Sequence, residues 1–105
     1  MAWIWLILAG LLEVGWAIGL RYTEGFSKLI PSLLTLSLMA ASFFLLSQAL
    51  ETIPMGTAYA VWTGIGSLGV ALAGIFFFQE SSDIWRLVCI GLIVMGVLGL
   101  KWNAA

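Results

Sequence analysis

The sequence predicts an all-α membrane protein with four transmembrane helices. Its 105 residues are 63% hydrophobic and only 9% charged, whereas a soluble domain carries about 25% charged residues. The mean hydropathy is +1.14, and each apolar stretch is long enough to cross a bilayer, which takes about 20 residues. Because the polar turns are short, consecutive helices should run antiparallel and both termini should lie on one side of the membrane. We therefore expect a single transmembrane domain over residues 1–105.

The first helix is expected over residues 3–20. Its apolar run ends at Arg21, where charged residues and a glycine begin a turn. The run resembles a secretion signal in length, but it lacks a basic leading segment, and Glu13 interrupts its apolar centre. We therefore expect it to be retained as the first membrane helix.

The second and third helices are expected over residues 29–49 and 55–78. Pro54 fits the start of the third helix, because a proline needs no hydrogen-bond acceptor there. The third helix is rich in glycine, which lets helix backbones approach closely in a bilayer. Two of these glycines, Gly64 and Gly66, mark a place in mid-span where the helix can bend.

The fourth helix is expected over residues 84–100, with Ser81 or Ser82 as its cap. Cys89 lies within this apolar run and is expected to serve packing. The helix carries no candidate for the chemistry of a site. Small and aliphatic residues at helical spacing form a stripe along it, which predicts a packing and dimerisation surface. This stripe consists of Gly91, Val94, Met95 and Leu98.

The basic residues predict no firm orientation in the membrane. Arg21, Lys28 and Arg86 should fall on one side and Lys101 on the other, which is a weak bias under the positive-inside rule. Transporters place their site between two repeats of inverted topology, and this chain has no such internal repeat. Two copies inserted in opposite orientations would supply it, so we expect the protein to function as an antiparallel homodimer.

Glu13 is the one carboxylate in the apolar run between Trp3 and Leu20. An ionisable group at that depth costs about 2.5–3.5 kcal/mol or more, and it is by default a candidate functional site. Two such carboxylates brought together in a dimer can hold protons and release them when a cation arrives. Proton and cation would then compete for one site, which is the minimum requirement for exchange. The alternative is a structural acid that is hydrogen-bonded across a helix interface.

Several small or polar residues are candidates for lining a site around Glu13. They are Gly10, Trp16, Ser42, Tyr59 and Trp62. Gly10 and Trp16 lie three residues to either side of Glu13 and share its helix face. Trp16 can donate its indole N–H to the carboxylate or offer its ring to a cation. A serine in mid-helix, such as Ser42, can instead bond its own helix backbone.

The composition argues against several other classes of function. The chain contains no histidine and has a formal charge of −1, so neither a histidine-based metal site nor a nucleic-acid-binding surface is expected. The sequence offers no nucleophile–base pair and no cluster of metal ligands. We therefore expect neither an enzyme nor a cofactor.

Three stretches carry a resemblance to a known family. They are Gly10–Glu13 in the first helix, Glu24–Phe26 in the first loop, and residues 54–64, PMGTAYAVWTG, in the third helix. Through them the chain resembles the small multidrug resistance family over its whole length. Within that family it is most similar to the guanidinium-exporter branch. The residues that favour this branch are Gly10, Trp16, Ser42, the run Trp62–Gly66, and Lys101.

The resemblance implies an antiparallel homodimer in the bacterial inner membrane that exports guanidinium ion in exchange for protons. In that family the residue matching Glu13 carries both proton and substrate. Those matching Trp16, Ser42 and Trp62 hydrogen-bond and position it, and the one matching Tyr59 lines the site and helps to switch access. The resemblance also implies a glycine bend in the third helix and dimerisation through the fourth.

Two alternative functions remain open. The other main branch of the family exports quaternary ammonium compounds, and a small membrane subunit without transport activity would use Glu13 only for packing. Planar guanidinium suits a lone carboxylate better than a quaternary ammonium does, because it presents two N–H donors in a fork.

Overall fold

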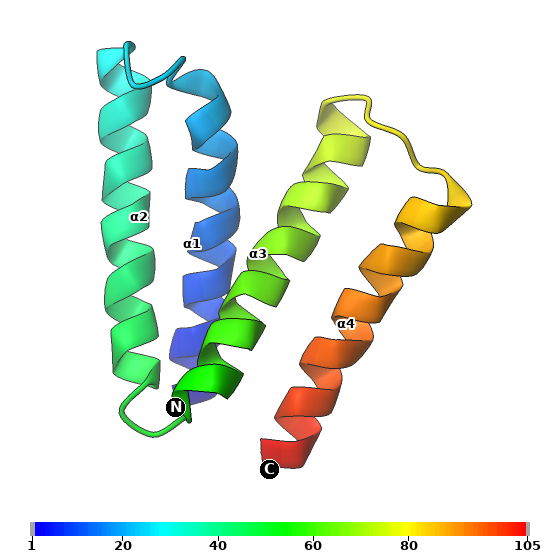
Figure 1. Ribbon diagram of the computed structural model, residues 1–105. Coiled ribbons are helices and arrows are strands. Elements are labelled where there is room, and N and C mark those ends of the chain that lie inside the picture. The colour runs from blue at the N-terminus through cyan, green and yellow to red at the C-terminus, as the bar shows by residue number, and fades with distance from the viewer. Residues whose placement is uncertain (1, 105) are drawn as a thin grey trace.

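The computed structural model describes residues 2–104 as four long helices joined by short turns (Figure 1). The helices are α1 (Ala2–Tyr22), α2 (Leu29–Ala49), α3 (Met55–Phe77) and α4 (Ile84–Ala104), with no strand among the described residues. Each helix is long and apolar enough to cross a membrane. α1 and α4 run somewhat beyond the expected ranges, because helical hydrogen bonding continues past the last apolar residue into interfacial positions such as Trp102.

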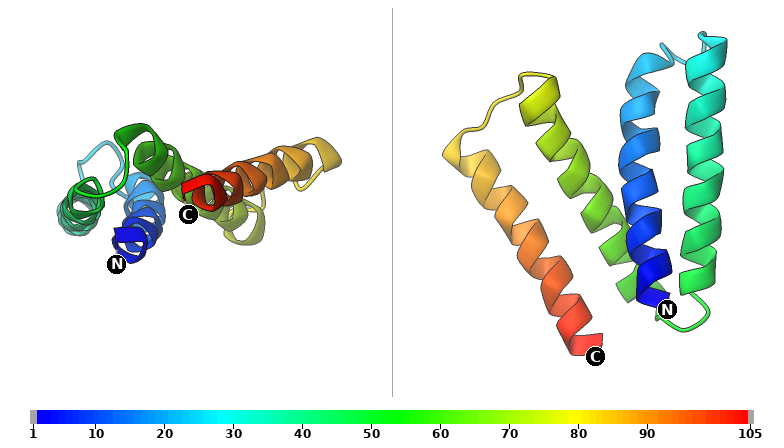
Figure 2. Two further views of the ribbon diagram at one scale, coloured as in Figure 1. Left: turned by 90° about the horizontal axis from the view of Figure 1, so that it is seen from below. Right: turned by 180° about the vertical axis from the view of Figure 1, so that it is seen from behind.

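The helices alternate in direction, and both ends of the chain lie at the same end of the molecule (Figure 1). α1 packs between α2 and α3, whereas α4 lies along α3 at the outer edge (Figures 1 and 2). The overall extents are 42 × 35 × 17 Å. Because a helix with its side chains is about 10–12 Å across, the molecule is a slab less than two helices thick.

A small core forms where α1, α2 and α3 meet. Its buried members are Leu6, Ala9, Ala49, Ile53, Ala58, Val61 and Trp62. α4 adds little to it, since Ile90 is the one buried residue among the α4 side chains that the structure describes. The outer faces expose many large apolar side chains, including Phe77 and Trp85 at 79% and 77%. Such a surface is stable against lipid rather than water.

α3 ends in a left-handed turn at Gln79, whose φ is +56°. The N–H groups of Phe78 and Glu80 both donate to the carbonyl oxygen of Gly74, at 3.2 and 2.9 Å. The left-handed residue Gln79 lets the chain double back after the helix, so that the N–H of Glu80 reaches one of the last carbonyls. The turn sends Glu80 back over the end of α3.

Asp83 caps α4, and the expectation that Ser81 or Ser82 does so was wrong. Its Oδ1 accepts the backbone N–H of Arg86 at 2.9 Å, while Ser81 donates its hydroxyl to Oδ2 at 3.0 Å. A carboxylate at this position also interacts favourably with the helix dipole. These two hydrogen bonds hold the pKa of Asp83 below its usual range.

Cys89 does not pack inside the chain. Its side chain is exposed on α4, so the packing role expected from the sequence is not fulfilled within one copy.

Candidate functional site

Glu13 lies in the middle of α1, with its side chain against α3. The carboxylate rests on Gly66, where a Cβ atom would collide with both Cδ and Oε1 of Glu13. Oε1 is buried and has no hydrogen-bond partner within residues 2–104. A buried carboxylate oxygen without a partner is costly, so this group is available to a ligand rather than committed to the fold.

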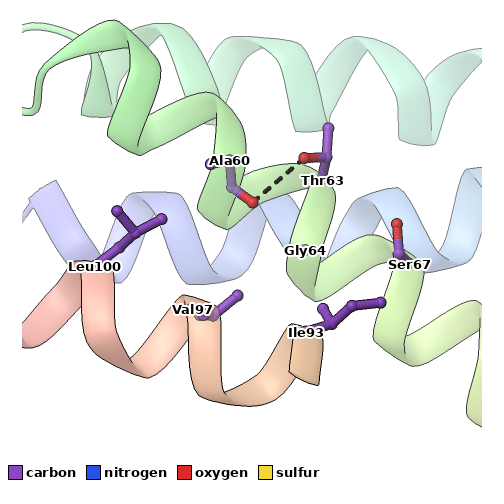
Figure 3. Close-up of a pocket in the computed structure, with 8 residues that line it drawn as sticks. Ala60, Thr63, Gly64, Ser67, Ile93, Val97 and Leu100 are labelled. Atoms are coloured by element: carbon purple, nitrogen blue, oxygen red, sulfur yellow. Dashed lines mark hydrogen bonds between the residues drawn. The ribbon is translucent and has the colours of Figure 1, made fainter. Parts of the chain in front are cut away.

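Glu13 lines a cavity of about 400 Å³ between α1, α3 and the start of α4. Its walls are formed by Glu13, Ala17, Gly66, Ser67, Val70, Ala71, Glu80 and Arg86. A larger cavity of about 590 Å³ lies between α3 and α4 (Figure 3). The lining of that larger cavity contains no ionisable side chain, and of its two hydroxyl groups, on Thr63 and Ser67, that of Thr63 bonds the α3 backbone. We therefore place the candidate site in the cavity that contains Glu13.

Trp16, three residues after Glu13 on α1, makes no hydrogen bond to it and is not among the residues that line this cavity. Its indole N–H is buried and has no acceptor in the part of the chain that the structure describes. Its ring packs edge-on against Phe43 of α2, with ring centroids 6.1 Å apart. Within one turn, α1 therefore carries a buried acceptor on Glu13 and a buried donor on Trp16 that have no partner among the described residues.

Ser42 is fully buried and joins three helices through its hydroxyl group. The hydroxyl donates to the carbonyl oxygen of Ala9 in α1 at 2.7 Å, and it accepts the indole N–H of Trp62 in α3 at 3.0 Å. In an α-helix the carbonyl of residue 9 is also the acceptor for the backbone N–H of residue 13. Ser42 and Trp62 thus hold α1 at the turn that carries Glu13, without contacting the carboxylate.

Ser42 differs in this respect from the other α2 serines. Ser37 and Ser47 donate to backbone carbonyls of α2 itself, at 2.8 and 2.6 Å. That is the common arrangement for a hydroxyl in a membrane helix. The contact between helices therefore singles out Ser42.

Four aromatic rings form a continuous row across the three helices. Phe43 connects Trp16 to Trp62, at 5.6 Å from the latter, and Tyr59 follows at 5.5 Å from Trp62. Tyr59 is 56% exposed. The row thus leads from the neighbourhood of Glu13 to the outer surface.

The predicted glycine positions make close helix contacts. A Cβ on Gly10 would collide with Ile65 of α3, and one on Gly64 would press on Val97 of α4. α3 is a continuous helix through Gly64 and Gly66. The bend expected at these two residues therefore stays a prediction, and their observed role is close packing.

The predicted α4 stripe has few neighbours within one copy. Met95 and Leu98 are 69% and 63% exposed, Val94 is half-buried, and a Cβ on Gly91 would meet no described atom within 4 Å. The stripe is therefore free to contact another molecule or lipid.

Three features of the site were not recognised in the sequence. The contact of Gly66 with Glu13 depends on how α1 and α3 pack, and Phe43 is inconspicuous among many apolar residues of α2. α4 was expected to bring no chemical group, yet Arg86 lines the Glu13 cavity together with Glu80. The sequence signal for that pair is two opposite charges flanking a short turn.

The arrangement can bind a small cation but offers no metal centre. No three Asp, Glu or Cys side chains come together in the described residues as a metal ion would require. A buried carboxylate that lines a small cavity is suited to a small organic cation, which gains an ion pair and charge-assisted hydrogen bonds.

Four apolar helices around one intramembrane carboxylate define a small multi-pass membrane protein that handles a cation. The family profile described as Small Multidrug Resistance protein matches residues 1–93. The chain therefore belongs to the small multidrug resistance family, which confirms the resemblance seen in the sequence. Membership in this transporter family, together with four spanning helices, makes it a multi-pass protein of the inner membrane.

Curated relatives match along almost the entire chain. A protein of Yersinia pestis named "Guanidinium exporter" is 58% identical over 101 residues, which cover 96% of this chain and 97% of that one. A protein of the same name from Salmonella typhimurium (strain LT2) is 56% identical over 104 residues, or 99% of both chains. One from Citrobacter freundii is 56% identical over 101 residues, or 96% of both. These names are those of transporters rather than enzymes.

Proposed function

We propose that this protein is a proton-coupled antiporter that exports guanidinium ion across the bacterial inner membrane. Proton and guanidinium compete for Glu13 of each copy. The observation that carries this proposal is the buried, unpartnered Oε1 of Glu13 in a cavity. Relatives named "Guanidinium exporter" that match this chain along its length supply the substrate.

The surroundings of Glu13 favour a planar cation with N–H donors. Gly66 leaves room for the carboxylate against α3, and Ser42 with Trp62 anchors the helical turn that carries Glu13. A carboxylate held in one orientation rewards a forked donor such as guanidinium and gives a quaternary ammonium no such advantage. The indole of Trp16 and the ring of Tyr59 add aromatic surface for the cation, and Tyr59 helps to switch access.

The working unit that we propose is an antiparallel homodimer. Two observations support it. The single copy is only 17 Å thick, which leaves much of the cavity wall to a second molecule. On α4, Gly91, Gly96 and Gly99 all lack neighbours within 4 Å of a built Cβ among the described atoms, and open glycines of this kind suit close packing of two membrane helices. Opposite insertion of the copies would bring two Glu13 carboxylates to one site.

The test is proton-driven guanidinium uptake into proteoliposomes that contain the purified protein. Uptake should follow an imposed proton gradient, and Glu13→Gln should abolish it while leaving folding and dimer formation intact, because an amide neither binds nor releases a proton. Gradient-driven uptake by Glu13→Gln would refute the mechanism. Uptake of tetraethylammonium in place of guanidinium would assign the protein to the quaternary ammonium branch. Absence of flux for both cations would indicate a membrane subunit without transport activity.

A further inference from the structure

The Glu13 cavity contains a second carboxylate, at the end where α3 turns into α4. Glu80 and Arg86, here called the mouth pair, both line this cavity. They form an ion pair through Arg86 Nη2 and Glu80 Oε1. Their side chains remain 43% and 31% exposed, respectively, so the pair lies where the cavity meets the surrounding medium.

The backbone aims Glu80 at the cavity. The left-handed turn at Gln79 and the bond from the Glu80 N–H to the carbonyl of Gly74 fold the residue back over α3. Its carboxylate occupies the space above Gly74, where a Cβ would collide with Oε1 and Cδ. Glu80 therefore repeats the arrangement of Glu13 on Gly66, with a carboxylate resting on a glycine of α3.

A smooth trough on α3 connects the two carboxylates. The positions between the two glycines that line the cavity carry only Ser67, Val70 and Ala71. Gly66 and Gly74 are eight residues apart in one helix, a distance of about 12 Å along its axis. A small planar cation can move along such a wall without displacing a bulky side chain.

Glu80 already binds a guanidinium group, namely that of Arg86. The substrate that we propose is the same group without its tether, so it can form the same charge-assisted hydrogen bonds with Glu80. Arg86 is in turn fixed near the site, because its backbone N–H is bonded to Asp83. The guanidinium of Arg86 thus acts as a tethered competitor for the substrate.

We propose that Glu80 is a second cation-binding carboxylate, which guanidinium occupies on its way between water and Glu13, and that Arg86 fills it when no substrate is there. This inference rests on the proposed function and adds a binding step at the mouth of the same cavity. Without Arg86 beside it, Glu80 would hold guanidinium and slow the passage of the cation through the cavity. The Arg86 side chain prevents this by returning to the carboxylate once the cation moves on.

A purely structural role for the mouth pair would be to tie the turn to α4. The turn between α1 and α2 has a matching ion pair, Glu24 and Lys28 at 3.2 Å, on the same end of the molecule. That pair is absent from the lining of the Glu13 cavity. It therefore provides the matched control.

The first test measures guanidinium binding by NMR line broadening in the full-length protein carrying Glu13→Gln, so that it does not depend on transport. Glu13→Gln alone should bind little, because Arg86 occupies Glu80. Adding Arg86→Gln should increase bound guanidinium at least tenfold, and adding Glu80→Gln to that should abolish the gain. Tetramethylammonium, which has no N–H donors, should show no comparable gain. Absence of a gain, or a gain that survives Glu80→Gln, would overturn the proposal.

The second test uses the intact Glu13 site in proteoliposomes. Glu80→Gln should raise the KM for guanidinium at least threefold with the maximal rate unchanged, whereas Glu24→Gln should change neither. If Arg86→Gln does not fold, Arg86→Lys replaces it in the first test, because it keeps the charge but lacks the fork, and it should release part of the Glu80 site. Equal KM values for Glu80→Gln and Glu24→Gln would overturn the proposal. Failure of the wild type to transport guanidinium would instead contradict the proposed function.

Discussion

At the scale of single residues, the site depends on the lack of a side chain at Gly66 as much as on Glu13. Gly66 leaves the space in which the carboxylate lies against α3. Any larger residue there must move the far end of the Glu13 side chain, which is flexible, rather than the helix backbone. A change at this position should therefore affect binding more than folding.

Gly66→Ala is expected to weaken guanidinium binding about tenfold or more, because the added methyl group occupies the place of the carboxylate; a tenfold loss corresponds to about 1.4 kcal/mol of binding free energy. Calorimetric titration of the purified protein measures the affinity, and thermal unfolding in detergent should change little. The control is Gly56→Ala, at an α3 glycine whose built Cβ meets nothing within 4 Å. Unchanged affinity in Gly66→Ala would show that the carboxylate has another place to lie.

Ser42→Ala is expected to lower both stability and selectivity. It leaves the buried indole N–H of Trp62 without its acceptor, which should reduce the free energy of unfolding by about 1–3 kcal/mol. It also frees the α1 turn that carries Glu13, so guanidinium affinity should fall more than that of a quaternary ammonium. Titration of both cations measures this, with Ser37→Ala as the control because that hydroxyl bonds only its own helix. Equal losses for both cations would leave Ser42 as ordinary packing.

At the scale of helices, the two ends of the α3–α4 turn are fixed by different chemistry. The left-handed residue Gln79 follows the end of α3, and the carboxylate of Asp83 caps the start of α4. Since this turn also carries Glu80, its geometry determines where the mouth of the cavity lies.

Asp83→Ala is expected to speed amide hydrogen exchange in the first turn of α4, whereas Asp83→Asn should retain part of the protection. The pKa of Asp83 is lowered in the folded protein, so its stabilisation is present above the ordinary Asp pKa of about 3.9 and is lost as pH falls through the lower folded value. The difference in thermal unfolding between wild type and Asp83→Ala should thus persist at neutral pH and disappear only in strong acid. A difference that does not change with pH would exclude the charged cap as its source.

The sequence predicted helices better than the contacts between them. Hydropathy alone separates four spans, because each must satisfy its backbone within itself in a bilayer. Glu13 could be recognised for the same physical reason, as a charge with no partner nearby in its run. The partners of Ser42 could not, since a donor to Ala9 and an acceptor for Trp62 arise only when three helices meet. The path of Glu80 was equally hidden, because it depends on a left-handed turn at Gln79, a residue that is not glycine.

At the scale of the whole molecule, the slab has two broad apolar faces and little basic bias between its ends. We expect both orientations in the membrane. A cysteine appended after residue 105, in a Cys89→Ala background because Cys89 is exposed, should react with impermeant reagents from both sides of sealed vesicles. Reaction from one side alone would contradict the antiparallel homodimer.

The position of the two termini at one end (Figure 1) constrains how such an opposed pair could be built into a single polypeptide. Joining two copies end to end through a short linker returns the second copy to the membrane in the same direction as the first. A fused protein with opposed halves would require one additional crossing between them, or the loss of one helix. Duplication and fusion of this gene would therefore give two halves in the same orientation. Two opposed halves in one polypeptide need an odd number of spans per half or an added spanning linker.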